Sequence, residues 1–109
     1  MIILRRVLKL DTSAREVEVP IAIHIPVDKH DHWECEYEIG WPSGVKRRSA
    51  YGIDSVQALL IALQNIGVEI YTSDAHRSGK LIWHRPEGGY GFPLHSGLRD
   101  LHQGDDKAL

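Results

Sequence analysis

Cysteine and long hydrophobic runs are nearly absent from this chain of 109 residues. The single cysteine, Cys35, excludes an intramolecular disulfide and a cysteine-rich metal site. No stretch reaches the roughly 18 apolar residues that a membrane-spanning helix needs. Residues 1–6 place their charges after the apolar residues, which is unlike a signal peptide. We therefore expect a cytoplasmic protein with no membrane partner.

An excess of charge of either sign is also lacking. The chain has 13 Lys and Arg against 15 Asp and Glu, for a formal net charge of −2. This balance does not point to nucleic acid or an anionic membrane as an obligatory partner. Hydrophobic residues make up 42% of the chain, which is ordinary for a globular protein. Length and composition predict one domain over residues 1–109, with a polar, frayed tail over about residues 103–109.

Alternating apolar and polar residues predict the first strands. Residues 2–10 alternate loosely, and residues 17–25 place an aliphatic residue at every second position. Residues 11–14 are the expected turn between these two strands. Pro20 removes one backbone donor from the second strand, which favours an edge position or a bulge.

The clearest alternation spans residues 33–39 and predicts the first strand of a hairpin. Its apolar side chains share one face and its three glutamates share the other. Residues 40–44 form the expected loop, and the return strand, residues 45–51, carries a run of basic residues. Antiparallel pairing would place basic groups opposite glutamates, at roughly 0.2–1 kcal/mol for each exposed pair.

The strongest helix signal lies over about residues 54–66. Asp54 is the expected N-cap, with Gln57 at the capping-box position, and Gly67 is the expected stop. Residues 68–72 and 80–84 then read as short strands. Together these elements predict an α+β fold, in which an antiparallel sheet of four to six strands packs one central helix on one face.

The start of this helix also carries a family resemblance. Three motifs carry it: Gly52-x-Asp54-Ser55-x-Gln57-Ala58-Leu59, the later Gly91-Phe92-Pro93 and the earlier Trp33-x-Cys35-x-Tyr37. Together they resemble a family of small bacterial proteins with a domain of unknown function. The resemblance covers roughly residues 30–95. It implies a compact, cytoplasmic bacterial domain and supplies no activity, cofactor or catalytic residue.

Histidines are the main candidates for metal binding. His30 and His32 lie in one short polar segment, and His24 lies on the strand before it. Imidazole, with a neighbouring carboxylate, suits a transition metal such as zinc, nickel or copper. The alternative is a solvated loop, because no second pair at ligand spacing accompanies these histidines.

Catalytic signatures are weak throughout. A Ser-His-Asp catalytic triad could combine Ser55, His84 and Asp74, but no Gly-x-Ser-x-Gly turn surrounds Ser55. Cys35 alternates with aromatic residues, which favours a buried and inert thiol. The glycine-rich stretch 88–91 lacks the lysine of a phosphate-binding loop. We therefore do not expect an enzyme.

Aromatic residues in or beside turns are the main candidates for binding. Tryptophan and tyrosine are enriched at the centres of protein interfaces. The candidate binding residues are Trp41, Trp83, Tyr90 and Phe92. The alternative is that they fold back and cover the ends of the sheet.

The leading hypothesis is a non-enzymatic binding or protein-interaction module with an unknown partner, or one that forms a homodimer through a sheet edge. The alternative is a metal-binding protein that uses His30 and His32. The third hypothesis is a nucleic-acid accessory protein, in which two basic clusters would contact phosphate: Arg5, Arg6, Arg47 and Arg48.

Overall fold

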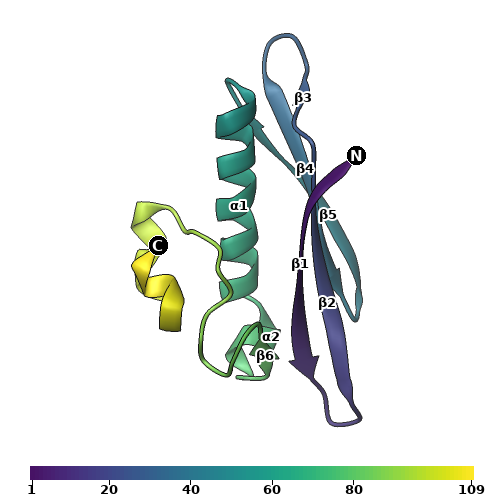
Figure 1. Cartoon of the computed structure of the whole chain (residues 1–109), viewed down its shortest axis with the longest axis vertical. Coiled ribbons are helices and arrows are strands. Elements are labelled where there is room, and N and C mark those ends of the chain that lie inside the picture. Colours follow the sequence, from purple (N-terminus) through teal and green to yellow (C-terminus); the bar gives the residue numbers. More distant parts are fainter.

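Alternating side chains build four long antiparallel strands, and these form most of a six-stranded sheet. The computed structural model describes residues 1–109. The long strands are β1 (Ile2–Asp11), β2 (Glu16–His24), β4 (Trp33–Trp41) and β5 (Gly44–Gly52), and the short ones are β3 (Val27–Asp28) and β6 (Leu81–Ile82). Helix α1 (Ser55–Tyr71) lies against one face of the sheet, as Figure 1 shows. The predicted α+β fold is confirmed.

The sheet is ordered β5–β4–β2–β1–β6. Strand β3 pairs with the start of β4, on the edge along which β2 pairs with its end. All pairs are antiparallel, and the expected 33–51 hairpin forms with Trp33 opposite Gly52. The four long strands therefore pair in chain order, β1 with β2, β2 with β4 and β4 with β5, whereas β6 returns to pair with β1.

Pro20 does not lie in an edge strand, because β2 is paired on both sides. Its expected edge position is wrong, and the irregularity in the β1–β2 ladder falls between Ile2 and Leu4. The β2–β4 ladder covers only Ile21–Ile23, so the missing N–H of Pro20 interrupts no paired residue there. Gly40 leaves room for the proline ring, since a Cβ at Gly40 would come within 2.9 Å of Pro20 Cγ.

Helix α1 starts where the sequence predicts and ends five residues later than predicted. The Asp54 side chain accepts a hydrogen bond from the backbone N–H of Gln57 at 2.8 Å. The helix continues to Tyr71, so Gly67 is not its stop and residues 68–72 do not form a strand. Gly67 is buried inside the helix, where a Cβ would lie 2.5 Å from the Pro93 carbonyl oxygen. Its role is to let the 91–94 segment approach the helix.

The core lies between α1 and the sheet face that it covers. The helix contributes a stripe of buried residues four apart: Ala58, Ala62, Ile66 and Ile70. The sheet contributes the inward side chains of its strands, among them Leu8, Val19, Ile21, Ile39 and Tyr37. No element covers the opposite, outer face of the sheet, as Figure 1 shows. No helix of the structure is both long and apolar enough to span a membrane.

The chain after α1 returns along the helix and closes on itself through Asp106. This part contains α2 (Asp74–Arg77), β6 and two 3-10 helices, Ser96–Leu101 and Gly104–Ala108. Asp106 is only 2% exposed, although it lies in the stretch expected to be a frayed tail. It accepts hydrogen bonds from the Tyr71 hydroxyl at 2.6 Å and from the backbone N–H groups of Tyr90 and Gly91 at 2.7 Å each. We call these four residues the C-terminal clasp.

Candidate binding site

The four aromatic residues expected to bind a partner do not share a surface. Tyr90 and Phe92 are 2% and 3% exposed and belong to the core. Burial raises the pKa of the Tyr90 hydroxyl to about 12, and that hydroxyl lies 2.5 Å from Nδ1 of His76. Trp41 and Trp83 are partly buried and pack against the core. Tyr90 therefore offers no contact surface, because the C-terminal clasp holds it inside the protein.

Each of the candidate metal ligands contacts a different carboxylate. His30 has a positive φ of 78° at a turn, and its N–H donates to the Asp28 carboxylate. Nδ1 of His32 lies 2.6 Å from the neighbouring Asp31 carboxylate. His24 is held on the outer face of the sheet by glutamates. No group of three or more His, Cys, Asp or Glu residues is placed to hold a metal ion.

The residues considered for nucleophilic chemistry occupy separate parts of the fold. Ser55 begins α1, whereas Asp74 follows its last turn. The 17 residues of the helix separate them by about 25 Å, given a rise of about 1.5 Å per residue. Cys35 is fully buried, and burial raises the pKa of its thiol, which disfavours the reactive thiolate.

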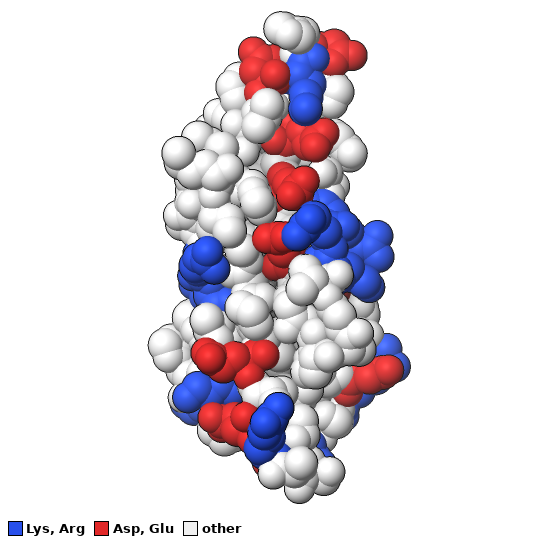
Figure 2. Space-filling model, turned by 90° about the vertical axis from the view of Figure 1, so that its right-hand side faces the viewer, with Lys and Arg blue, Asp and Glu red and all other residues white.

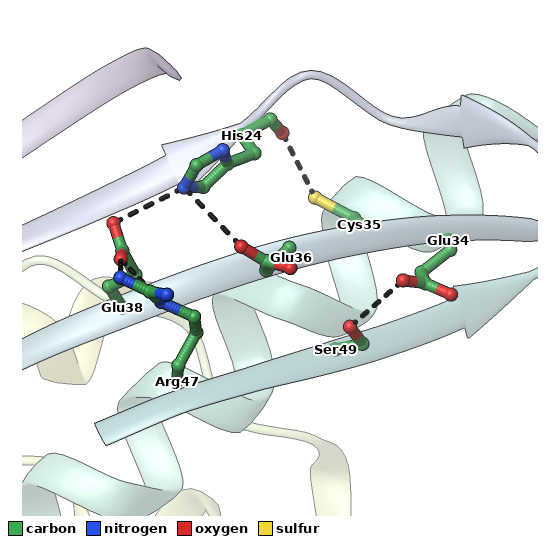
Figure 3. Close-up of polar contacts among 7 residues, drawn as sticks. All are labelled: His24, Glu34, Cys35, Glu36, Glu38, Arg47 and Ser49. Atoms are coloured by element: carbon green, nitrogen blue, oxygen red, sulfur yellow. Dashed lines mark hydrogen bonds and ion pairs between the residues drawn. The ribbon is translucent and has the colours of Figure 1, made fainter. Parts of the chain in front are cut away.

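The outer face of the sheet carries a connected polar ladder. Figure 2 shows acidic side chains along the middle of this face, with basic groups beside them. In Figure 3, Nε2 of His24 lies 3.2 Å from a Glu38 carboxylate oxygen and 3.7 Å from one of Glu36. The other Glu38 oxygen accepts a hydrogen bond from Arg47 Nε at 2.7 Å. The hydrogen bond from His24, followed by that from Arg47, lowers the pKa of Glu38.

The basic run of β5 is largely neutralised by acidic neighbours. Arg47 pairs with Glu38, and Arg48 donates to Glu69 on α1 at 3.1 Å. Glu69 also accepts a hydrogen bond from the Tyr37 hydroxyl, and burial with this contact raises the pKa of Tyr37. These pairs occupy Arg47 and Arg48, two of the four arginines that the nucleic-acid hypothesis would require for phosphate.

Strand β1, by contrast, has an open edge along most of its length. Its inner neighbour is β2, and on the other side β6 pairs only with Lys9 and Leu10. The part of the edge before Lys9 has no strand partner. It carries exposed aliphatic side chains, with Ile3 41%, Leu4 45% and Val7 40% exposed. A bare sheet edge of this kind is a template for pairing with another chain.

A hollow of about 250 Å³ lies beside this open edge, on the inner side of the sheet. Its apolar lining comes from three parts of the fold: Leu4, Ile21, Ile23, Leu63, Phe92 and Pro93. Phe92 thus contributes to a recess although it was expected to lie in an exposed loop. Because Gly67 and the C-terminal clasp position the 90–94 segment, both help to shape this hollow.

Two arginines, Arg5 and Arg6, also border the hollow. Neither has a carboxylate partner within 4.0 Å, whereas Lys9 further along β1 pairs with Glu16 at 3.8 Å. The Arg6 guanidinium lies 4.1 Å from the centre of the Trp83 ring and donates to the Gly91 carbonyl at 2.9 Å. Partial burial lowers the pKa of Arg6, and the charge of Asp106 opposes this shift.

Fold and site together define a small α+β domain with one covered sheet face and one open sheet edge. A family model described as a domain of unknown function (DUF6968) matches residues 4–94. The chain belongs to this family, which confirms the resemblance to a domain of unknown function. No curated protein and no solved structure matches the chain. The match contains β1 from Leu4 onward and the residues that line the hollow, whereas Asp106 lies outside it.

Proposed function

We propose that this protein is a non-enzymatic protein-interaction module that binds its partner along the open edge of β1. The observation that carries the proposal is the unpaired edge with Ile3, Leu4 and Val7 exposed beside an apolar hollow. Natural sheets usually protect such edges with a short strand, a bulge, a proline, basic side chains or a covering segment, and β1 has basic side chains and one irregularity, between Ile2 and Leu4. Here β6 protects only the end of β1, and a cluster of exposed aliphatic groups remains available for contact.

The setting of this module is part of the proposal. A bacterial cytoplasm is supported by the family resemblance and by the single, buried and unpaired cysteine, which suits a reducing compartment. Fractionation of source cells into cytoplasm, membrane and exterior, followed by immunoblotting, tests this location.

Site-specific photo-crosslinking in the source cells tests the proposed function. A photoreactive amino acid replaces Val7 on the open edge or, as a control, Leu60 on α1, which is 47% exposed. The proposal expects a discrete crosslinked protein from position 7 and none from position 60. Absence of crosslinks at position 7, or the same products from both positions, would contradict it.

A further inference from the structure

We infer that β1 receives an extended strand of a partner protein in which aliphatic and acidic residues alternate. This inference rests on the proposed function and specifies the partner's chemistry. It depends on three features of the described residues: the direction of the free backbone groups, the side chains on either side of the edge, and the unpaired arginines.

Alternate residues of β1 direct their backbone groups toward the open edge. The N–H of Asp11 donates to the Lys80 carbonyl oxygen at 3.0 Å, on the side where β6 lies. Because backbone groups alternate between the two sides of a strand, those of Lys9, Val7 and Arg5 face the same way. Lys9 lies opposite Ile82 of β6, so the open groups are those of Val7 and Arg5. An added strand would therefore extend the line of β6 along β1, which is recognition by strand addition.

The side chains of the added strand would alternate between the hollow and the outer face of the sheet. Leu4 belongs to the inner row and lines the hollow together with Leu63 and Phe92. A partner residue that points inward next to Leu4 would enter this apolar recess. At about 250 Å³ the recess lies below the roughly 300–1,000 Å³ usual for small-molecule sites, and it suits an aliphatic side chain.

The charges along the edge select acidic residues in the partner. From Ile2 to Leu10 the strand carries Arg5, Arg6 and Lys9 and no acidic residue. The residue opposite Arg5 on β2 is Ala22, so no carboxylate on the neighbouring strand neutralises the charge of Arg5. Only Nη1 of Arg6 donates to protein oxygens, which leaves its other donors for a ligand. Opposite charges across neighbouring strands stabilise pairing, and like charges oppose it.

The same charges disfavour a second copy of this chain as the occupant. Two β1 edges would bring arginines against arginines. The other sheet edge, β5, has no acidic residue, and the carboxylates near it already pair with its own arginines, so it offers Arg5 of a second copy no free partner. Basic residues on edge strands are a common protection against edge-to-edge association. The homodimer expected from the sequence is therefore the less favoured occupant of this edge.

Fluorescence anisotropy with two labelled ten-residue peptides tests the inference on the full chain. One peptide alternates valine and glutamate, and the other alternates valine and lysine. We expect the glutamate peptide to bind at least tenfold more tightly. Arg5→Glu should remove or reverse this preference, whereas Arg15→Glu, the same charge change at the exposed β1–β2 turn, should retain it. Val7→Pro should weaken binding at least tenfold, since Val7 offers its N–H to the added strand.

Several outcomes would overturn the inference. Equal binding of the two peptides, no binding of either, or an unchanged preference in Arg5→Glu would each do so. A dimer in sedimentation velocity that Val7→Pro dissociates would assign the edge to a second copy instead. If position 7 crosslinks to a partner in cells while neither peptide binds, the proposed function survives and this inference fails. If crosslinking fails as well, both fail. Arg5→Glu changes only an exposed side chain, so the test stands even if Val7→Pro does not fold.

Discussion

Replacing Asp106 by alanine should remove a large part of the stability of this domain. The carboxylate is 2% exposed and accepts three hydrogen bonds, from the Tyr71 hydroxyl and the N–H groups of Tyr90 and Gly91. Hydrogen bonds to a charged group contribute about 1.5–3 kcal/mol each, and donors left unpaired inside a protein add a desolvation penalty. Because water can replace the deleted carboxylate and satisfy some donors, we expect a loss of about 3–5 kcal/mol rather than the full sum.

Urea unfolding followed by tryptophan fluorescence measures this loss. With a urea slope of about 1–3 kcal/mol per molar, the midpoint of Asp106→Ala should fall by at least about 1 M. Asp106→Asn keeps one acceptor oxygen and should lose less, while Asp100→Asn changes an exposed carboxylate and should stay within about 0.5 kcal/mol of the parent. If Asp106→Ala unfolds within that same margin, the C-terminal clasp does not stabilise the domain and our reasoning is refuted.

Three further changes test other parts of the fold. Gly67→Ala should destabilise by about 1–3 kcal/mol in urea unfolding, because its Cβ would lie 2.5 Å from the Pro93 carbonyl oxygen, whereas Gly97→Ala, with nothing within 4 Å, should not. Burial lowers the pKa of His76 below 6.5, so the unfolded chain takes up the proton first and stability falls as the pH drops below about 6.5. His76→Gln should flatten this fall between pH 7.5 and 5.5. An unchanged pH profile would show that His76 does not cause the fall in stability. The hydrogen bond from His24 lowers the pKa of Glu38, so its contribution is present above about pH 4.5 and is lost on acidification. Glu38→Gln should therefore cost under about 1 kcal/mol at pH 7, and this cost should shrink as the pH falls below about 4.5.

Local patterns were sufficient to predict most of the sheet and the start of the helix. The alternation around Cys35 and Tyr37 sets which face of β4 is buried, and both residues are in the core. The capping interaction of Asp54 with Gln57 depends on neighbouring residues only, so it could be identified without tertiary information. These features follow from periodicity and capping, which act over a few residues.

The end of the helix was mispredicted because tertiary contact overrides the local signal. Gly67 has the residue type of a helix stop, but its lack of a side chain serves the close approach of Pro93. Beyond it, Val68, Ile70 and Tyr71 look like a strand by β propensity. Ile70 nevertheless completes the buried stripe of α1, four residues after Ile66. Propensity is a weak signal when a longer amphipathic pattern continues through it.

The candidate binding site could not be predicted from the sequence, because it depends on which strands pair with β1 and over what length. Alternation shows that residues 2–10 form a strand, but not that β6 covers only Lys9 and Leu10. The burial of Tyr90 likewise depends on Asp106, 16 residues later, in a stretch whose composition is that of an exposed tail. A run of aliphatic and basic residues with no acidic partner was the one available signal, and it was assigned to phosphate contact instead.

The C-terminal clasp imposes an order of assembly during synthesis. Strands β1 and β2, then β4 and β5, pair with neighbours in sequence and can form as they leave the ribosome. The carboxylate that fixes Tyr90 and Gly91 emerges only with residue 106. Phe92 and Pro93, which line the hollow beside β1, therefore reach their final places last. A nascent chain would expose the bare β1 edge before the recess beside it is complete, so selective binding at this edge would begin only when synthesis has passed Asp106.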